Sequence, residues 1–138
     1  MTVELDQAHA AAGLNLLRAD TALTVHDGRV PDGAVPPYVV VYTTVEWPTD
    51  DPDNGIDHLS TTCVTRWFCH CVGSNAAAAR AVAGRVRVAL LDVRPPIPGR
   101  VCERIKSEAA SAPPRRDEST GRLVMDAVQV YRMRSRPA

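Results

Sequence analysis

Two long segments rich in β-branched and aromatic residues, 38–47 and 61–73, limit what this chain can fold into more than any other feature. Both favour extended strands, because branched and aromatic side chains fit a pleated sheet. The first half of 38–47 is almost continuously apolar, which indicates burial on both faces. A polar loop at 48–60 separates the segments, so we expect them to pair as antiparallel neighbours across it.

Helical patterns lie on both sides of this strand pair. The first covers residues 3–19, and the second follows Ser74, which we expect to be the N-cap, over residues 75–93. The prolines at 95 and 96 are expected to end the second helix. The apolar positions that we expect on the buried sides are Leu5, Ala8, Ala12, Leu16 and Ala19 in the first helix, and Ala78, Ala79, Val82, Val86, Ala89, Leu90 and Val93 in the second.

Shorter β-prone segments complete the pattern. Val25 and His26 suggest a short strand, and 100–106 and 123–134 suggest a C-terminal hairpin around a charged loop. A sheet that is covered on one face by two helices is the natural two-layer arrangement for these elements. The sequence therefore predicts a single α+β domain, 1–138, with a mainly antiparallel or mixed sheet of four to five strands and a frayed tail at 135–138.

The length and charge of the chain limit the classes of protein to which it can belong. A chain of 138 residues is expected to form one domain with one core. Its formal net charge of zero argues against a dedicated nucleic-acid binder. No apolar run approaches the roughly 20 residues needed to span a bilayer, and the acidic start is unlike a secretory signal. We therefore expect the chain to begin in a reducing cytoplasm, with its cysteines as thiols.

The run Cys69-His70-Cys71, with Cys63 upstream, is the sharpest chemical motif. On an extended strand, side chains alternate, so the three cysteines share one face with Trp67 while His70 points the other way. The run cannot supply three ligands to one metal ion, and it lacks the paired spacing of structural zinc sites. We interpret the cysteines as buried packing residues and predict no catalytic residue, no metal site and no cofactor.

Two charged loops are the remaining candidates for a functional surface. The loop 48–60 carries four aspartates without the spacing of a calcium-binding loop, which indicates a solvated loop. The loop 112–122 carries both signs of charge. Phosphate-binding, serine-hydrolase and metalloprotease signatures are absent from the sequence. The candidate interface residues are Asp50, Asp51, Asp53, Asp57, Arg115, Arg116, Asp117 and Glu118.

Several stretches, taken in order, carry a resemblance to a known family. They are "VHDGRVPDGAVPPYVVVY", a strand ending in "CVG", "SNAAAARAVAGRVRVALLDVRP", "IPGRVCERI", "RRDESTGRLV" and "AVQVYRMRSRP". Together they cover most of the chain, and it resembles the tail terminator (tail completion) proteins of long-tailed bacteriophages. That family has no short catalytic motif, so the resemblance implies a structural protein and no enzyme.

The resemblance implies a tail-terminator-like domain that assembles into a ring, usually a hexamer. Such a ring caps the tail tube, stops its polymerisation and offers the joining surface for the head-neck connector. The implied partners are other copies of the chain, the tail tube protein and the connector, with no membrane. DNA is expected to pass through the lumen without specific binding. The implied location is the tail or neck of a virion, after synthesis in the host bacterial cytoplasm.

Three alternatives remain open from the sequence. One is a tail-to-head joining or connector adaptor protein of similar size. Another is a small metal-binding protein that uses the cysteines and His70, and the third is a binding module of the host cytoplasm. For a ring, we expect one or both charged loops to contact a neighbouring subunit or the tube, because head-to-tail assemblies join two different patches. Acidic groups that face a central channel would also repel the phosphates of passing DNA.

Overall fold

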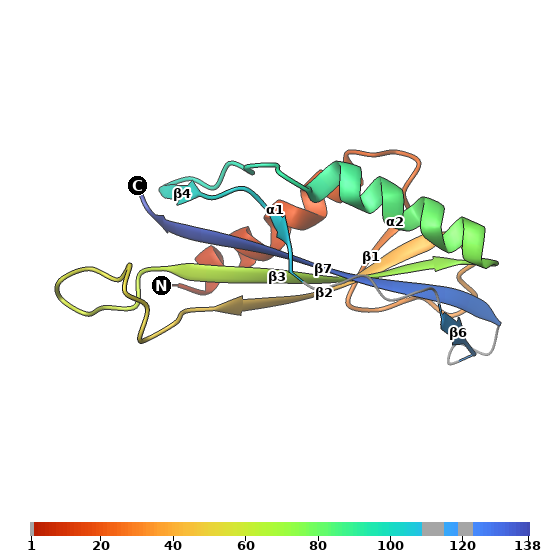
Figure 1. Cartoon of the computed structure of the whole chain (residues 1–138), viewed down its shortest axis with the longest axis horizontal. Coiled ribbons are helices and arrows are strands. Elements are labelled where there is room, and N and C mark those ends of the chain that lie inside the picture. The colour runs from red at the N-terminus through yellow and green to blue at the C-terminus, as the bar shows by residue number, and fades with distance from the viewer. Residues whose placement is uncertain (1, 109–114, 119–122) are drawn as a thin grey trace.

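Two helices lie on one face of a mixed β-sheet in the computed structural model, which describes residues 2–108, 115–118 and 123–138 (Figure 1). The elements are α1 (Val3–Arg18), β1 (Val25–Asp27), β2 (Tyr38–Glu46), β3 (Cys63–Gly73), α2 (Ala76–Leu90), β4 (Arg100–Cys102), β5 (Lys106–Ser107), β6 (Arg115–Asp117) and β7 (Val124–Pro137). The α+β prediction is confirmed. The described sheet has seven strands instead of four to five, because short strands line the outer side of β7.

The strands β2, β3 and β7 form the centre of the sheet. The sheet order is β1-β2-β3-β7-β4, and β5 and β6 also pair with β7. The predicted antiparallel pairing of β2 with β3 is confirmed, with Tyr38 opposite Val72 and Glu46 opposite Val64. β3 pairs antiparallel with β7 over its whole length. β1 runs parallel to β2, which makes the sheet mixed.

The core lies between the helices and one face of the sheet. Strand alternation places Trp67, Cys69 and Cys71 in this core, as predicted, and all three are fully buried. Helix α1 is rotated relative to the predicted face. The buried residues of α1 are His9, Ala12, Gly13, Leu14 and Leu17, whereas Leu5, Ala8 and Leu16 are half-buried and Ala19 is exposed.

The close approach of α1 to the sheet explains this rotation. A Cβ atom on Gly13 would lie 2.4 Å from Cε2 of Trp67, so the missing side chain of the glycine lets the helix rest on the indole ring. The indole Nε1 donates a hydrogen bond of 3.2 Å to the carbonyl oxygen of Ala10. The helix therefore comes closest to the sheet at its smallest residue. The expected apolar stripe lies beside this line of contact, with Ala12 in the core and Leu5, Ala8 and Leu16 packed against it.

The boundaries of α2 also differ from the prediction. Asn75, and not Ser74, is the N-cap, and its Oδ1 accepts a hydrogen bond of 2.8 Å from the backbone N–H of Ala78. The helix ends at Leu90, before the prolines, because the chain turns to bond with the segment ahead of β5. The backbone N–H of Asp92 donates to the carbonyl of Ile105, and the N–H of Ile105 donates to the carbonyl of Val93.

The C-terminal part of the chain differs from the prediction in three places. The expected strand 100–106 is two short strands, because Cys102 and Ile105 are both buried and cannot lie on one face of a regular strand. The charged loop 112–122 contains strand β6. The expected frayed tail at 135–138 is wrong for Ser135 to Pro137, which belong to β7 and pair with β4. Ser135 is 2% exposed because its hydroxyl bonds to buried groups.

The second face of the sheet carries no helix in the described part of the chain. A small apolar cluster of Tyr38, Val72 and Val124 covers one end of it, together with Val30 and Ala34. No described helix is long and apolar enough to cross a membrane. The two faces therefore differ, with one closed by helices and the other carrying polar and half-buried side chains.

Candidate interaction surface

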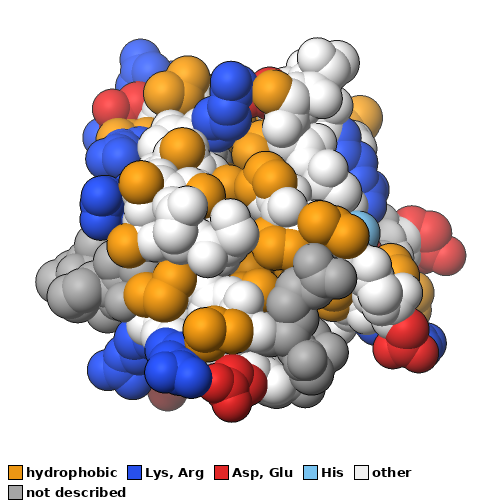
Figure 2. Space-filling model, turned by 90° about the vertical axis from the view of Figure 1, so that its right-hand side faces the viewer, with side chains coloured by type: hydrophobic (Ala, Val, Ile, Leu, Met, Phe, Trp, Pro, Cys, Tyr) orange, Lys and Arg blue, Asp and Glu red, His pale blue; other side chains and the backbone are white. Residues whose placement is uncertain are grey.

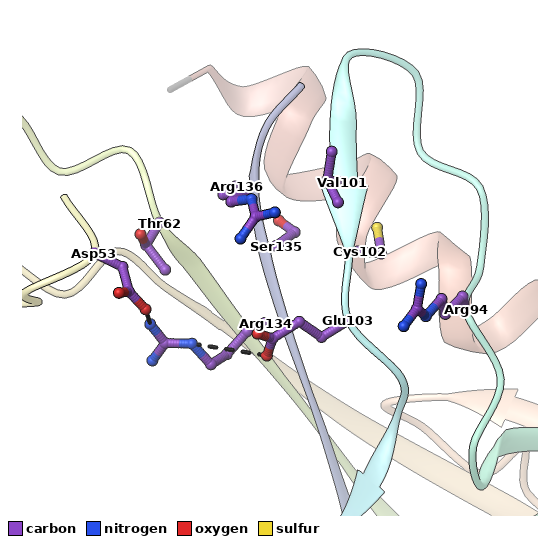
Figure 3. A pocket seen from close by; sticks show the side chains of 9 residues that line it. All are labelled: Asp53, Thr62, Arg94, Val101, Cys102, Glu103, Arg134, Ser135 and Arg136. Atoms are coloured by element: carbon purple, nitrogen blue, oxygen red, sulfur yellow. Dashed lines mark hydrogen bonds and ion pairs between the residues drawn. The ribbon is translucent and has the colours of Figure 1, made fainter. Parts of the chain in front are cut away.

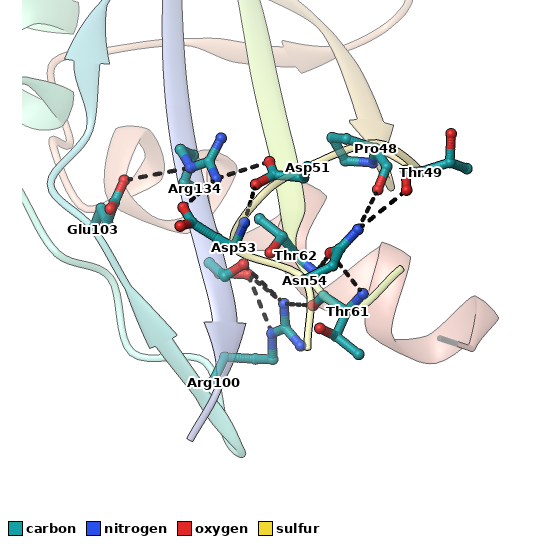
Figure 4. A network of polar contacts seen from close by, with 11 residues as sticks. Pro48, Thr49, Asp51, Asp53, Asn54, Thr61, Thr62, Arg100, Glu103 and Arg134 are labelled. Carbon is teal, nitrogen blue, oxygen red and sulfur yellow. Dashed lines mark hydrogen bonds and ion pairs between the residues drawn. The ribbon is translucent and has the colours of Figure 1, made fainter. Parts of the chain in front are cut away.

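The acidic loop, residues 48–60, lies at the end of the sheet where both termini are found (Figure 1). Asn54 fastens the base of this loop. Its Nδ2 donates to the carbonyl of Pro48 at 3.1 Å, and its Oδ1 accepts from the backbone N–H groups of Thr61 and Thr62 at 3.2 and 3.3 Å (Figure 4). One side chain thus joins the start of the loop to its return into β3.

Arg134 of β7 holds the same loop from the side. Its NH2 group donates to Asp51 at 2.8 Å and to Asp53 at 2.9 Å, and its Nε lies 3.9 Å from Glu103 (Figure 4). The side chain of Asp51 is only 6% exposed. A hydrogen bond from the backbone N–H of Asp53 lowers the pKa of Asp51, and Arg134 lowers it further.

The structure therefore separates the predicted acidic group into two pairs. Asp51 and Asp53 are engaged inside the chain, so the expectation of a fully solvated loop is wrong for Asp51. Asp50 and Asp57 are exposed and take part in no ion pair among the described residues. The second pair is therefore the one whose carboxylates have no basic partner among the described residues.

A buried polar cluster supports the loop from below. Arg100 donates to the carbonyl of Thr61 at 2.8 Å and to the carbonyl and hydroxyl of Ser135 at 3.0 Å, and its guanidinium lies 5.3 Å from the centre of the Trp47 ring. His9, which is fully buried, contacts the Ser135 hydroxyl through Nε2 at 2.6 Å. The cluster ties α1, the chain after β2, β4 and the end of β7 together.

The hydrogen bonds of His9 define its protonation. Its Nδ1 lies 2.8 Å from the carbonyl oxygen of Leu5, which can only accept, so Nδ1 carries a proton. In the neutral ring, Nε2 then accepts from the Ser135 hydroxyl at 2.6 Å. Burial lowers the pKa of His9. Sequence reasoning missed both His9 and Arg100. The only signal was a histidine on a helix whose other buried positions, Ala12, Gly13, Leu14 and Leu17, are non-polar.

A hollow of about 230 Å³ lies beside the loop, between the end of β7 and strand β4 (Figure 3). Arg94, Arg134 and Arg136 line it together with the acids Asp53 and Glu103. Within the described part of the chain, Arg94 and Arg136 form no ion pair, and the buried hydroxyl of Thr62 has no hydrogen-bond partner. The surface around the loop is therefore polar and of mixed charge.

The loop tip, Ile56 and Leu59, is apolar and exposed. Ile56 is 99% and Leu59 is 61% exposed. Local bonds shape the turn between them, since the N–H of His58 donates to the carbonyl of Gly55 at 2.8 Å and the N–H of Leu59 donates to Asp57 at 3.1 Å. Two neighbouring large apolar side chains that protrude from a fastened loop are typical of a contact surface.

The second group of predicted interface residues, 115–118, lies far from the aspartates of the acidic loop. β6 pairs with the start of β7, at the other end of the sheet (Figure 1). Arg116 pairs with Glu118 at 2.6 Å, and the side chains of both are largely exposed. Arg115 is exposed, while Asp117 is half-buried. Of the loop 112–122, the structure describes residues 115–118, and the other residues lie outside the described part of the chain. The structure therefore does not combine the eight candidate residues into one surface.

The cysteines lie where strand alternation predicted. All four are free and buried, and burial raises the pKa of Cys63 to about 11 and of Cys69 to about 12. His70 points to the opposite face, where its Nδ1 lies 2.9 Å from Oδ2 of Asp126 and this contact raises its pKa. In residues 2–108, 115–118 and 123–138, no three His, Cys, Asp or Glu side chains gather as metal ligands.

His9 and His70 are expected to affect stability with opposite pH dependence. His9 has a lowered pKa in the folded state, so its stabilising effect is present above about pH 6.5 and is lost as the pH falls. His70 has a raised pKa, so its effect is present below about pH 6.5 and is lost as the pH rises through the folded-state pKa.

Chemical denaturation of H9Q and H70Q at about pH 5.5 and about pH 8 checks this prediction. The stability deficit of H9Q relative to the unmodified chain should be larger at the higher pH, and that of H70Q should be larger at the lower pH. Deficits that change in the same direction for both variants would contradict it.

Comparisons with known proteins identify one matching family and a solved structure with a similar fold. The family described as Tail completion protein gp17 matches residues 8–132. A chain in a solved structure described as the virion of a native gene transfer agent particle is similar in three dimensions, with a TM-score of 0.72 and 20% sequence identity. The match covers 98% of this chain and 99% of that chain, which shows a shared fold. No curated protein sequence matches the chain.

Proposed function

The chain belongs to the tail completion protein gp17 family, and from this premise we propose that it forms a ring that caps the tail tube and ends its growth. Family membership makes it a structural tail protein of a phage-like virion. The finer role is the proposal. It includes a hexameric ring, contact with the last ring of the tube protein on one side and a joining surface for the head-neck connector on the other.

The observation that carries the proposal is the acidic loop with its apolar tip. The loop is held by Asn54 and Arg134, so the tip is presented in one shape before any partner arrives. Pre-ordering of this kind reduces the entropy lost on association. A protein that must assemble into a ring at a tube end gains from such a prepared contact.

The rest of the chain fits a structural role. The cysteines are buried thiols with raised pKa, which makes them poor nucleophiles. The formal net charge is zero, which suits a lumen through which DNA passes without specific binding. In the proposed ring, the exposed carboxylates of Asp50 and Asp57 either pair with a neighbouring chain or face the channel. No membrane partner is proposed.

Polymerisation of the cognate tube protein, with and without this chain, tests the proposal. Tubes without it should keep growing, whereas its addition in amounts far below those of the tube protein should stop elongation. A chain that binds the isolated connector and leaves tube growth unchanged would instead be an adaptor. Continued elongation with no binding to either partner would overturn the proposal.

A further inference from the structure

The loop tip and a hollow on α2 lie at opposite ends of the molecule. Figure 1 shows the acidic loop at one end of the long axis and the first turns of α2 at the other. The helix hollow, of about 150 Å³, lies between these turns, the segment after α1 and the start of β2. Residues that line it include Leu23, Pro37, Tyr38, Ala78, Ala81 and Val82.

The helix hollow suits an aliphatic side chain. Its lining is mostly apolar, and a cavity of about 150 Å³ holds a molecule the size of benzene in other proteins. Figure 2 looks at this end of the molecule, and hydrophobic side chains gather over its middle with charged side chains around the periphery. An apolar centre with a polar rim is the usual composition of a protein interface.

The charges of the two surfaces are complementary. Helix α2 carries three arginines, Arg80, Arg85 and Arg87, and no acidic residue. The acidic loop carries four aspartates, of which Asp50 and Asp57 take part in no ion pair among the described residues. Arg80 and Arg87 are likewise exposed without an ion pair there. Opposite charges around an apolar contact favour one partner and one orientation.

We propose that the loop tip of one copy docks in the helix hollow of the next copy, with Ile56 as the side chain that enters it. This inference rests on the proposed ring and names the contact that would close it. A chain cannot make this contact with itself, because tip and hollow lie at opposite ends. Two different patches that bind head to tail generate a closed ring when the rotation between copies closes.

Engineered cysteines test the contact directly. The four native cysteines are buried, so exposed cysteines introduced by I56C and A81C should oxidise first. The two single variants are mixed and treated with oxidised glutathione, with and without tail tubes, and cross-linked dimers are followed over time. Docking should raise the rate of the mixed pair at least about tenfold, because it raises the effective concentration of the two thiols.

A matched control uses V88C, which lies on the same helix and is 85% exposed. The pair I56C and V88C should cross-link slowly. A single chain that carries both I56C and A81C should give a ladder of oligomers that ends at a closed ring. Equal rates for the A81C and V88C pairs, both with and without tubes, would overturn the inference.

The outcome separates this inference from the proposed function. If cross-linking fails while the chain still stops tube growth, the contact between tip and hollow is ruled out and the proposed capping function is retained. If the ladder of cross-linked oligomers forms while tubes keep growing, the contact between tip and hollow is supported and the proposed capping function is wrong. I56D, at a fully exposed position, should abolish ring formation by an otherwise unmodified chain without affecting folding, which circular dichroism checks.

Discussion

Alanine at position 73 is expected to lower the free energy of unfolding by about 3 kcal/mol, the upper end of the usual cost of overpacking. Gly73 ends β3 and is buried against the first turn of α2. A Cβ atom there would lie 2.4 Å from the backbone nitrogen of Ala79 and 2.6 Å from the carbonyl carbon of Ala78. Backbone atoms cannot rotate away, so α2 would have to shift and disturb its packing on the sheet.

Urea denaturation of G73A measures this effect, and G84A is its matched control. Gly84 lies within α2, and the nearest atom to an added Cβ is the flexible end of Arg87 at 3.9 Å. Alanine should therefore stabilise the helix by about 0.5–1 kcal/mol. Equal stability of G73A and the unmodified chain would show that the strand and the helix are less closely packed than described.

Lysine at position 100 is expected to cost about 2 kcal/mol, because hydrogen bonds from charged groups to buried acceptors are among the stronger ones. Arg100 bonds to the carbonyl of Thr61 and to both oxygens of Ser135, and lies over the Trp47 ring. The compact ammonium group of lysine cannot reproduce this fork of donors. The Ser135 and Thr61 acceptors would lose their partner, and the base of the acidic loop would loosen.

R136K provides the comparison for R100K. Arg136 lies at the same end of the sheet, is exposed and forms no ion pair among the described residues, so its replacement should change stability by less than about 0.5 kcal/mol. Thermal unfolding of both variants checks the difference. A small effect at both positions would mean that Arg100 does not hold the end of β7 to the loop.

Strand alternation explains why the sequence predicted the centre of the fold well. In β3, a two-residue period separates Trp67, Cys69 and Cys71 from His70, and burial in the structure follows that period. Local rules were sufficient there because the strand is regular and one of its faces is covered by helices. The same rule placed His70 on the face opposite the two cysteines, where it contacts Asp126.

Contacts between distant segments could not be predicted from local patterns. Arg134 and Asp51 are 83 positions apart, and His9 and Ser135 are 126 positions apart. Neither pair leaves a periodic signal. The buried face of α1 is rotated from the predicted one because Gly13 packs on Trp67, and the end of α2 was wrong because Asp92 and Val93 bond to Ile105. In each case tertiary contact overrode the sequence pattern.

The interface role of the eight charged candidates stays a prediction. The structure reduces the number of aspartates in the acidic loop that are available to pair with a partner. Asp51 and Asp53 are engaged by Arg134, so they act through the shape of the loop. Asp50 and Asp57 remain available for a partner. The apolar tip between Gly55 and Ser60, which sequence reasoning passed over, is the more prominent feature of the loop.

Electron microscopy of tail tubes grown with this chain shows directly whether it caps them. We expect a closed ring of this chain at one end of each capped tube, with elongation stopped at that end, and continued growth of tubes that carry no ring. Tubes that elongate past bound copies, or copies found along the tube wall and never at its end, would contradict it.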